Sequence, residues 1–313
     1  MGLAELYQKL TAEQRDFQFG RVGADPLTEG FPRKRVVHAG IDGTPVSPAE
    51  AQGIWHELMS RPPTGEPTQT AYIHIPFCAS RCIYCGFYST LTPRAEKAAA
   101  VDLYVDALCK EAATQRHYIF GEKSDPAERL ETIYFGGGTP SQLHAHPIEK
   151  IFRCIAENYA DRMANYDDME ITLECNPDDI TTEYAENLRH LPINRISMGA
   201  QTFSDERLKF LRRRHKAADV QTAIDRLHRT GIENISIDLM FGFPNETIEE
   251  WQLDIDKAIA LDIEHLSAYS LMYEEGTPLY QLLQKGKVKD MDEELYRTMY
   301  DTLIDRLALA NYE

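Results

Sequence analysis

From residue 71 onward the chain alternates between short strand-like runs and amphipathic helical patterns, and this alternation limits the possible folds most strongly. Alternating strands and helices build a parallel sheet, so six such pairs predict an α/β fold with a partial (β/α)6 TIM-like barrel. Functional side chains are then expected at the carboxyl ends of the strands. The predicted strands are residues 71–75, 132–135, 170–175, 195–199, 235–240 and 265–271. The predicted helices are 95–118, 147–160, 181–190, 204–229, 247–261 and 292–309.

Local signals mark some helix ends within this pattern. Thr247 and Glu250 have the spacing of a capping box, which starts a helix. Val220, Ile224 and Leu227 share one helical face, and Gly231 follows as a stop signal.

Residues 1–70 have a different character, with many prolines and weak periodicity apart from a short stretch near 49–59. They are predicted to form an N-terminal extension that wraps the surface and contains one or two short helices. The expected organisation is therefore an extension over 1–70 and a core barrel over 71–313.

The net charge of −17, from 33 basic and 50 acidic residues, argues against a nucleic-acid partner because phosphate binding needs a basic surface. No apolar stretch reaches membrane-spanning length, so stable membrane insertion is not expected. The first residues lack the basic and apolar regions of a signal peptide. A cytoplasmic protein is the expectation.

Three of the six cysteines lie in one short run, Cys78, Cys82 and Cys85, which would directly follow the first strand. A closed zinc site needs four ligands, whereas three thiolates suit an iron–sulfur cluster that keeps one iron open to an external ligand. A redox thiol pair or zinc remains the alternative. A disulfide framework is not expected in a large chain with this cysteine distribution.

Two polar motifs follow later strands. Gly136, Gly137 and Gly138 precede Thr139 after the second strand, and successive glycines let a backbone approach a ligand and point N–H groups at a carboxylate. Glu174 ends the third strand, where its carboxylate could bond a ribose hydroxyl or an ammonium group, or form a salt bridge at the barrel rim.

The cysteine run, preceded by Tyr72-Ile-His-Ile-Pro-Phe, resembles the cluster loop of radical S-adenosylmethionine (SAM) enzymes. Residues 71–313 are similar to the oxygen-independent coproporphyrinogen III oxidase-like (HemN/HemW) family, and closest to its heme-utilisation ChuW/HutW group, the anaerobilin synthases. The resemblance implies a radical SAM barrel in which Cys78, Cys82 and Cys85 hold a [4Fe–4S] cluster.

The same resemblance implies contacts with SAM, in one or two molecules. It assigns no catalytic side chain, and it treats Arg212 and Arg214 as surface charge. The residues that match SAM-contacting positions of the family are Tyr72, Tyr84, Gly137, Gly138, Thr139, Glu174, Gln201, Arg213, Asp238 and Met272.

The implied chemistry is one-electron reduction of SAM on the open iron, which cleaves a carbon–sulfur bond and yields methionine and a 5′-deoxyadenosyl radical. Heme or another tetrapyrrole is the expected partner, and flavodoxin or ferredoxin the expected electron donor. The protein would supply orientation and a cavity with little water.

Three functions fit this resemblance. The oxidases carry a fourth cysteine where this chain has Phe87. The heme chaperones share Ile83-Tyr84-Cys85, but usually have an acidic residue at Gly86. The anaerobilin synthases, methyltransferases that open the porphyrin ring and release iron, share Gly86-Phe87 and the long N-terminal extension. Ring opening is therefore the predicted function, and Arg33, Lys34 or Arg35 would meet the heme propionates.

Relatives continue into a C-terminal domain, whereas this sequence stops after a helical pattern at Glu313. We expect that domain to be missing from this sequence. His74, which alternates with Ile73 and Ile75, is predicted to be a structural residue.

Overall fold

The computed structural model describes residues 47–59, 68–91, 97–120 and 128–312. The chain divides into two compact units, Met1–Arg61 and Pro62–Glu313. The first unit is described through helix α4 (Pro48–Met59). Ser47 and Glu50 cap this helix reciprocally, with N–H to side-chain oxygen distances of 2.7 and 3.3 Å. The rest of the predicted extension, including Arg33, Lys34 and Arg35, lies outside the described residues, and the predicted boundary at residue 70 stays a prediction.

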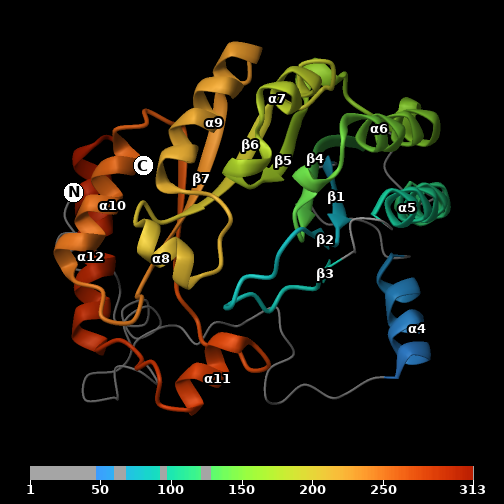
Figure 1. Cartoon of the computed structure of the whole chain (residues 1–313). Helices are drawn as coiled ribbons and strands as arrows, with labels where there is room; N and C mark the ends of the chain where they lie inside the picture. The colour runs from blue at the N-terminus through green and yellow to red at the C-terminus, as the bar shows by residue number, and fades with distance from the viewer. Residues whose placement is uncertain (1–46, 60–67, 92–96, 121–127, 313) are drawn as a thin grey trace, which may run out of the picture. The chain divides into compact units, whose positions relative to one another are not determined.

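The second unit is built on a sheet of six parallel strands in the order β1-β4-β5-β6-β7-β8 (Figure 1). Each strand pairs with the next in the sequence, so β1 and β8 form the two edges of the sheet. This arrangement confirms the predicted α/β class. The strands are β1 (Thr68–Ile75), β4 (Arg129–Gly137), β5 (Glu170–Cys175), β6 (Arg195–Gln201), β7 (Asn234–Phe241) and β8 (His265–Ser270).

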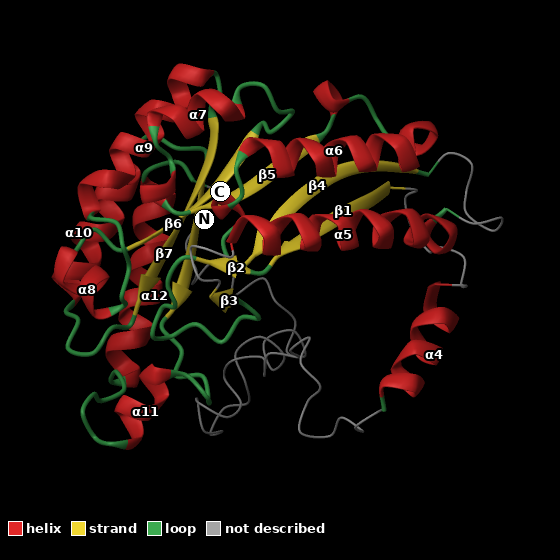
Figure 2. Ribbon diagram, turned by 45° about the vertical axis from the view of Figure 1, so that its right-hand side comes forward, coloured by secondary structure: helices red, strands yellow, loops and turns green. Residues whose placement is uncertain are grey.

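Helices follow each of these strands along the chain, and most of them line the outer side of the curved sheet (Figure 2). Among the described residues, none of the helices is long and apolar enough to cross a membrane. They are α5 (Lys97–Ile119), α6 (Ala145–Tyr159), α7 (Thr182–Leu188), α8 (Asp205–Phe210), α9 (Ala217–Thr230), α10 (Ile248–Ile259), α11 (Pro278–Gln284) and α12 (Glu293–Leu309).

The main core lies between the sheet and these helices. The predicted helical face of Val220, Ile224 and Leu227 is fully buried there, and α9 ends as expected where Gly231 takes a left-handed conformation, with φ 89°. The predicted capping box also forms: the Thr247 hydroxyl accepts from the Glu250 N–H, and the Glu250 carboxylate accepts from the Thr247 N–H. The local signals therefore set these helix ends as the sequence predicted.

The prediction of one helix over 204–229 was wrong, because the chain forms two helices, α8 and α9, with a turn between them. Arg212 has a left-handed backbone with φ 61°, which stops α8. The Arg213 N–H then bonds back to the Leu208 carbonyl at 2.8 Å. The apolar residues of the two helices have a similar spacing, so periodicity alone predicts one continuous helix. The sequence also missed α11 and the short strand pair β2 (Phe77–Cys78) and β3 (Thr90–Leu91).

Candidate cofactor site

The cysteine loop follows β1 and is anchored at its middle. The Ile83 side chain is buried in a second core cluster with Leu211 and Leu279, among other residues. Its N–H donates to the Leu211 carbonyl at 3.3 Å, and its carbonyl accepts from the Leu279 N–H at 2.9 Å. The segment between Cys82 and Cys85 is therefore held by both the α8–α9 turn and α11, while the cysteines themselves stay partly accessible.

All three cysteines are free, half-buried thiols. The Cys78 sulfur lies 3.4 Å from the Thr139 hydroxyl, and Arg213 Nη1 lies 3.7 Å from the Cys82 sulfur. Burial raises the pKa of Cys85, and Cys82 and Cys78 raise it further, against a hydrogen bond from the Phe87 backbone. The loop thus brings the three thiols close enough together for the charges of Cys78 and Cys82 to raise the pKa of Cys85.

In the parts of the chain that the structure describes, no three His, Cys, Asp or Glu side chains converge closely enough to hold a single metal ion. A four-iron cluster has a different geometric requirement. Each cysteine binds a different iron, so the sulfurs need not converge on one point. Three partly accessible thiols with a guanidinium beside one of them fit such a cluster, since the arginine offsets thiolate charge.

The glycine loop lies directly against the start of the cysteine loop. The Gly138 N–H donates to the Ile75 carbonyl at 2.8 Å, and a Cβ at Gly138 would lie 2.8 Å from the Pro76 carbonyl carbon and oxygen. Gly137 has φ 118°, a conformation that favours glycine. The sequence explained these glycines by the approach of a ligand; the structure adds close contact between two segments of the chain.

Glu174 lies at the end of β5 with two hydrogen bonds. Its Oε1 accepts from the Tyr134 hydroxyl at 2.9 Å, and its Oε2 accepts from the Gly137 N–H at 3.1 Å. Burial raises the pKa of Glu174, and these two hydrogen bonds oppose the rise. Tyr72 stacks on Tyr134 at a ring distance of 6.0 Å. Three predicted residues therefore form one group with Tyr134: Tyr72 from β1, Gly137 from β4 and Glu174 from β5.

Arg213 is the one arginine of its run that turns toward the cysteine loop. Its Nη2 donates to Asn176 Oδ1 at 2.5 Å and to the Gly199 carbonyl at 2.6 Å, while its Nη1 faces Cys82. A Cβ at Gly199 would lie 3.1 Å from the same Nη2, so this glycine makes room for the guanidinium. Sequence reasoning missed Asn176, although its place two residues after Glu174 at a strand end was an available signal.

The other predicted residues lie at different places: Tyr84 in the cysteine loop, Gln201 at the end of β6, and Asp238 in the middle of β7 instead of at its end. Burial raises the pKa of Tyr84, which lies close to Arg213, Cys82 and Cys85. Gln201 is buried at the end of β6 with φ 69°. Burial and the charge of Glu174 raise the pKa of Asp238, on β7, to about 6.

Tyr72, on β1, and Met272, just after β8, lie at opposite edges of the sheet. The predicted set therefore spans the whole sheet. Contacts within it include three separate pairs: Cys78 with Thr139, Cys82 with Arg213, and Gly137 with Glu174.

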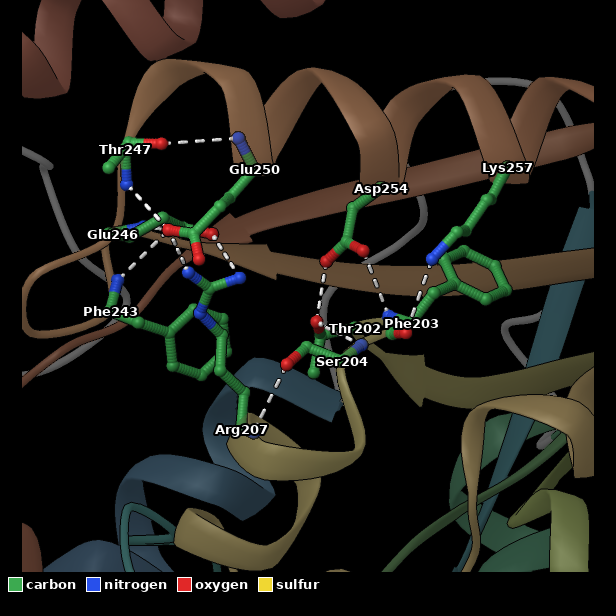
Figure 3. Close-up of polar contacts among 11 residues, drawn as sticks. Thr202, Phe203, Ser204, Arg207, Phe243, Glu246, Thr247, Glu250, Asp254 and Lys257 are labelled. Carbon is green, nitrogen blue, oxygen red and sulfur yellow. Dashed lines mark hydrogen bonds and ion pairs between the residues drawn. The ribbon is translucent and has the colours of Figure 1, made fainter.

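A polar network that the sequence did not indicate holds the loops after β6 and β7 (Figure 3). Asp254, on α10, accepts from the Thr202 hydroxyl and, at 3.1 Å, from the Phe203 N–H. Glu246 Oε2 accepts from the Gly242 and Phe243 N–H groups at 2.7 and 3.1 Å. These carboxylates fix the loop that follows Gln201 and the loop that follows Phe241 at the end of β7.

Residues 72–258 match the model of the Radical SAM superfamily. The chain is 37% identical over 239 residues to the heme chaperone HemW of Bacillus subtilis, which covers 76% of this chain and 60% of that relative. It is 35% identical over 243 residues to the heme chaperone HemW of Lactococcus lactis, covering 78% and 59%. The chain thus spans about three fifths of the length of these relatives.

A solved structure with a similar fold is coproporphyrinogen III oxidase (HemN) from Escherichia coli, described as a radical SAM enzyme. Its TM-score is 0.69 at 24% identity, and the match covers 83% of this chain and 56% of that one. At this identity the likeness shows the fold alone, and it agrees with the sheet and helix order described above.

Proposed function

The chain belongs to the radical SAM superfamily, and from this premise we propose that it binds heme and delivers it to other proteins. The observation that carries the proposal is the similarity to two heme chaperones, at 37% and 35% identity. These relatives favour the chaperone alternative over the ring-opening function that Gly86-Phe87 and the N-terminal extension suggested. Because the chain spans only part of their length, delivery is a property to be tested on this chain itself.

A [4Fe–4S] cluster and SAM are the cofactors of this chain. When bound, the pair supplies one-electron radical chemistry. We propose that Cys78, Cys82 and Cys85 hold the cluster, with Arg213 beside Cys82 offsetting its negative charge. A donor such as flavodoxin or ferredoxin is the proposed source of electrons.

The proposed SAM site lies between the glycine loop and the ends of β5 to β7. A carboxylate offers about four acceptor positions, and Tyr134 and Gly137 use two of those on Glu174. The remaining ones suit hydroxyl or ammonium donors of SAM. Asp238, with a pKa raised to about 6, is mostly ionised at neutral pH and can accept from a second donor group.

The proposed heme surface is aromatic. Tyr72, Phe87 and Tyr88 expose 57%, 72% and 82% of their surfaces, on β1 and directly after the cysteine loop. The rings of Tyr72 and Tyr88 lie 6.1 and 6.0 Å from the ring of His74, and the faces of grouped aromatic rings suit a flat, apolar macrocycle. At Gly86 an added Cβ would meet Glu274 at an ordinary 3.7 Å. A residue with a Cβ would therefore fit at this position. The presence of Gly86 is for this reason only weak support for the ring-opening function.

The test is anaerobic incubation of the reconstituted chain with heme, SAM and a reductant, followed by optical spectra and mass spectrometry. We expect the Soret band to persist and the heme to transfer to an apo-acceptor such as apomyoglobin. Loss of the Soret band with formation of a methylated linear tetrapyrrole would overturn the proposal in favour of ring opening. Turnover of coproporphyrinogen III would instead indicate an oxidase. Cys82→Ala is the matched control, because any SAM-dependent loss of heme should vanish in it.

A further inference from the structure

Asp179 joins three separate loops beside the proposed cofactor site. It ends the short 3-10 turn Pro177–Asp179 after β5, and only 9% of its side chain is exposed. Its Oδ2 accepts from the Ser141 hydroxyl at 2.7 Å. Its Oδ1 accepts from Gln142 Nε2 at 2.7 Å and from Arg214 Nη2 at 2.6 Å. One carboxylate therefore connects the loop after β4, the loop after β5 and the α8–α9 turn.

Each of these partners lies within three residues of a residue of the proposed site. Ser141 and Gln142 directly follow the segment 137–140 of the glycine loop, and Arg214 directly follows Arg213. The Asn176 N–H also approaches the Ser141 hydroxyl at 3.4 Å, while the Asn176 side chain accepts from Arg213. These hydrogen bonds, together with the peptide bond between Arg213 and Arg214, form a closed circuit. In it, Arg213 is the residue that also contacts Cys82.

We propose that Asp179 is a positioning residue, which fixes Arg213 and the glycine loop relative to each other so that both can meet SAM. The proposal rests on the proposed function for the role of SAM, but its geometric part concerns this chain alone. Hydrogen bonds to a carboxylate are stronger than neutral ones, and a shielded carboxylate with three donors holds its partners tightly. Loss of its charge should free the glycine loop and the turn together.

The neighbouring Asp178 provides a matched control. It contacts the same Arg214 Nη2 at 2.6 Å, but among the described residues its carboxylate accepts no hydrogen bond from the glycine loop. Its side chain is 22% exposed. Asp178→Asn and Asp179→Asn therefore remove the same charge one residue apart, and only the second acts on the glycine loop.

The first measurement is hydrogen exchange with mass spectrometry on the full chain without cofactors. Reporter amides are Gln142 and Leu143 in the first loop and Arg212 and Arg213 in the turn, because all four are hydrogen-bonded within their own segments. In Asp179→Asn we expect exchange in both segments to rise by about tenfold, as the loss of a charged hydrogen bond implies. In Asp178→Asn the first segment should exchange as in the wild type. Wild-type exchange in both segments of Asp179→Asn would overturn the proposal.

The second measurement is SAM binding by equilibrium dialysis after cluster reconstitution. We expect Asp179→Asn to retain wild-type iron content and to bind SAM about tenfold more weakly. Faster exchange with unchanged SAM affinity would leave Asp179 as a purely structural residue and would also refute the proposal. If the wild-type chain itself binds no SAM, the proposed function fails, and the exchange data still decide whether Asp179 couples the two segments.

A variant that fails to fold would not end the test. Arg214→Met cuts the third arm of the circuit together with the contact to Asp178, and it leaves the hydrogen bonds from Ser141 and Gln142 to Asp179 in place. We expect faster exchange at Arg212 and Arg213 and no change at Gln142 and Leu143. Equal loosening of both segments in this variant would contradict the central role of the Asp179 carboxylate.

Discussion

Glu246 is a buried carboxylate whose ionisation should make the stability of this protein depend on pH (Figure 3). Its Oε2 accepts two backbone N–H groups, and its Oε1 lies 3.5 Å from Arg207 Nη1. Burial outweighs these favourable contacts and raises the pKa of Glu246 to about 7. The perturbation is Glu246→Gln, which keeps an acceptor for the two N–H groups and leaves Arg207 its partner Glu250 at 2.5 Å.

The sign follows from proton binding. In the unfolded chain the carboxyl has its usual pKa of 4.5, so between pH 4.5 and 7 the folded state binds more protons. The contribution of Glu246 to stability is therefore fully present below pH 4.5 and is lost as the pH rises through about 7. A pKa change of this size corresponds to about 3 kcal/mol, and the side chain is fully buried, so solvent screening is small.

The assay is urea unfolding of the cluster-free, reduced chain at several pH values from 5 to 8. The free energy of unfolding of Glu246→Gln, relative to wild type, should increase by roughly 2–3 kcal/mol across this range, because other groups cancel in the difference. Glu250→Gln is the control. The pKa of Glu250 is lowered, chiefly by a hydrogen bond from the Thr247 backbone, so its effect should be constant above pH 5. A constant difference for Glu246→Gln as well would refute the reasoning.

Three further substitutions test the site and the core. Gly138→Ala places a Cβ against the Pro76 carbonyl and should destabilise the chain by about 1–3 kcal/mol in urea unfolding; wild-type stability would show that the contact relaxes freely. Ile83→Ala empties the anchor of the cysteine loop, at a cost of about 2–4 kcal/mol, and should lower the iron retained after reconstitution; undiminished iron would contradict this anchoring role. Trp251→Phe removes the indole N–H that donates to the Met299 carbonyl at 2.9 Å and should cost about 1 kcal/mol, read from the urea midpoint; an unchanged midpoint would count against that bond.

Much of the fold was predictable because it depends on short-range patterns. All six strands occur near the predicted positions, and the capping box and Gly231 ended their helices as predicted. Failures occurred where a single backbone conformation decides the outcome. Arg212 adopts a left-handed conformation that its residue type does not favour, and this breaks the predicted helix over 204–229. Helix α11 was missed although Thr277 and Pro278 form a helix-start signal, and this helix packs through Leu279 against Ile83.

The candidate site also divides into features that short-range sequence patterns predicted and features that depend on tertiary contacts. The cysteine spacing and its resemblance indicated an iron–sulfur centre, and the residue roles within the SAM site remain predictions. The sequence could not show that Asn176 accepts from Arg213, or that Asp179 gathers Ser141, Gln142 and Arg214. Those contacts join residues 35 to 38 positions apart. Hydrogen-bond partners at such separations follow from how neighbouring strands place their loops.

The sequence by itself determined the alternation of strands and helices, the acidic character of the chain and the three-cysteine run, because each is a property of adjacent residues. Only the tertiary structure decided which groups Arg213 and Arg214 bind and which carboxylates are buried. The physical reason is that burial, hydrogen bonding and pKa depend on surroundings assembled from distant parts of the chain. Arg213 contacts Cys82 and Arg214 contacts Asp179, although the two arginines are adjacent in the sequence.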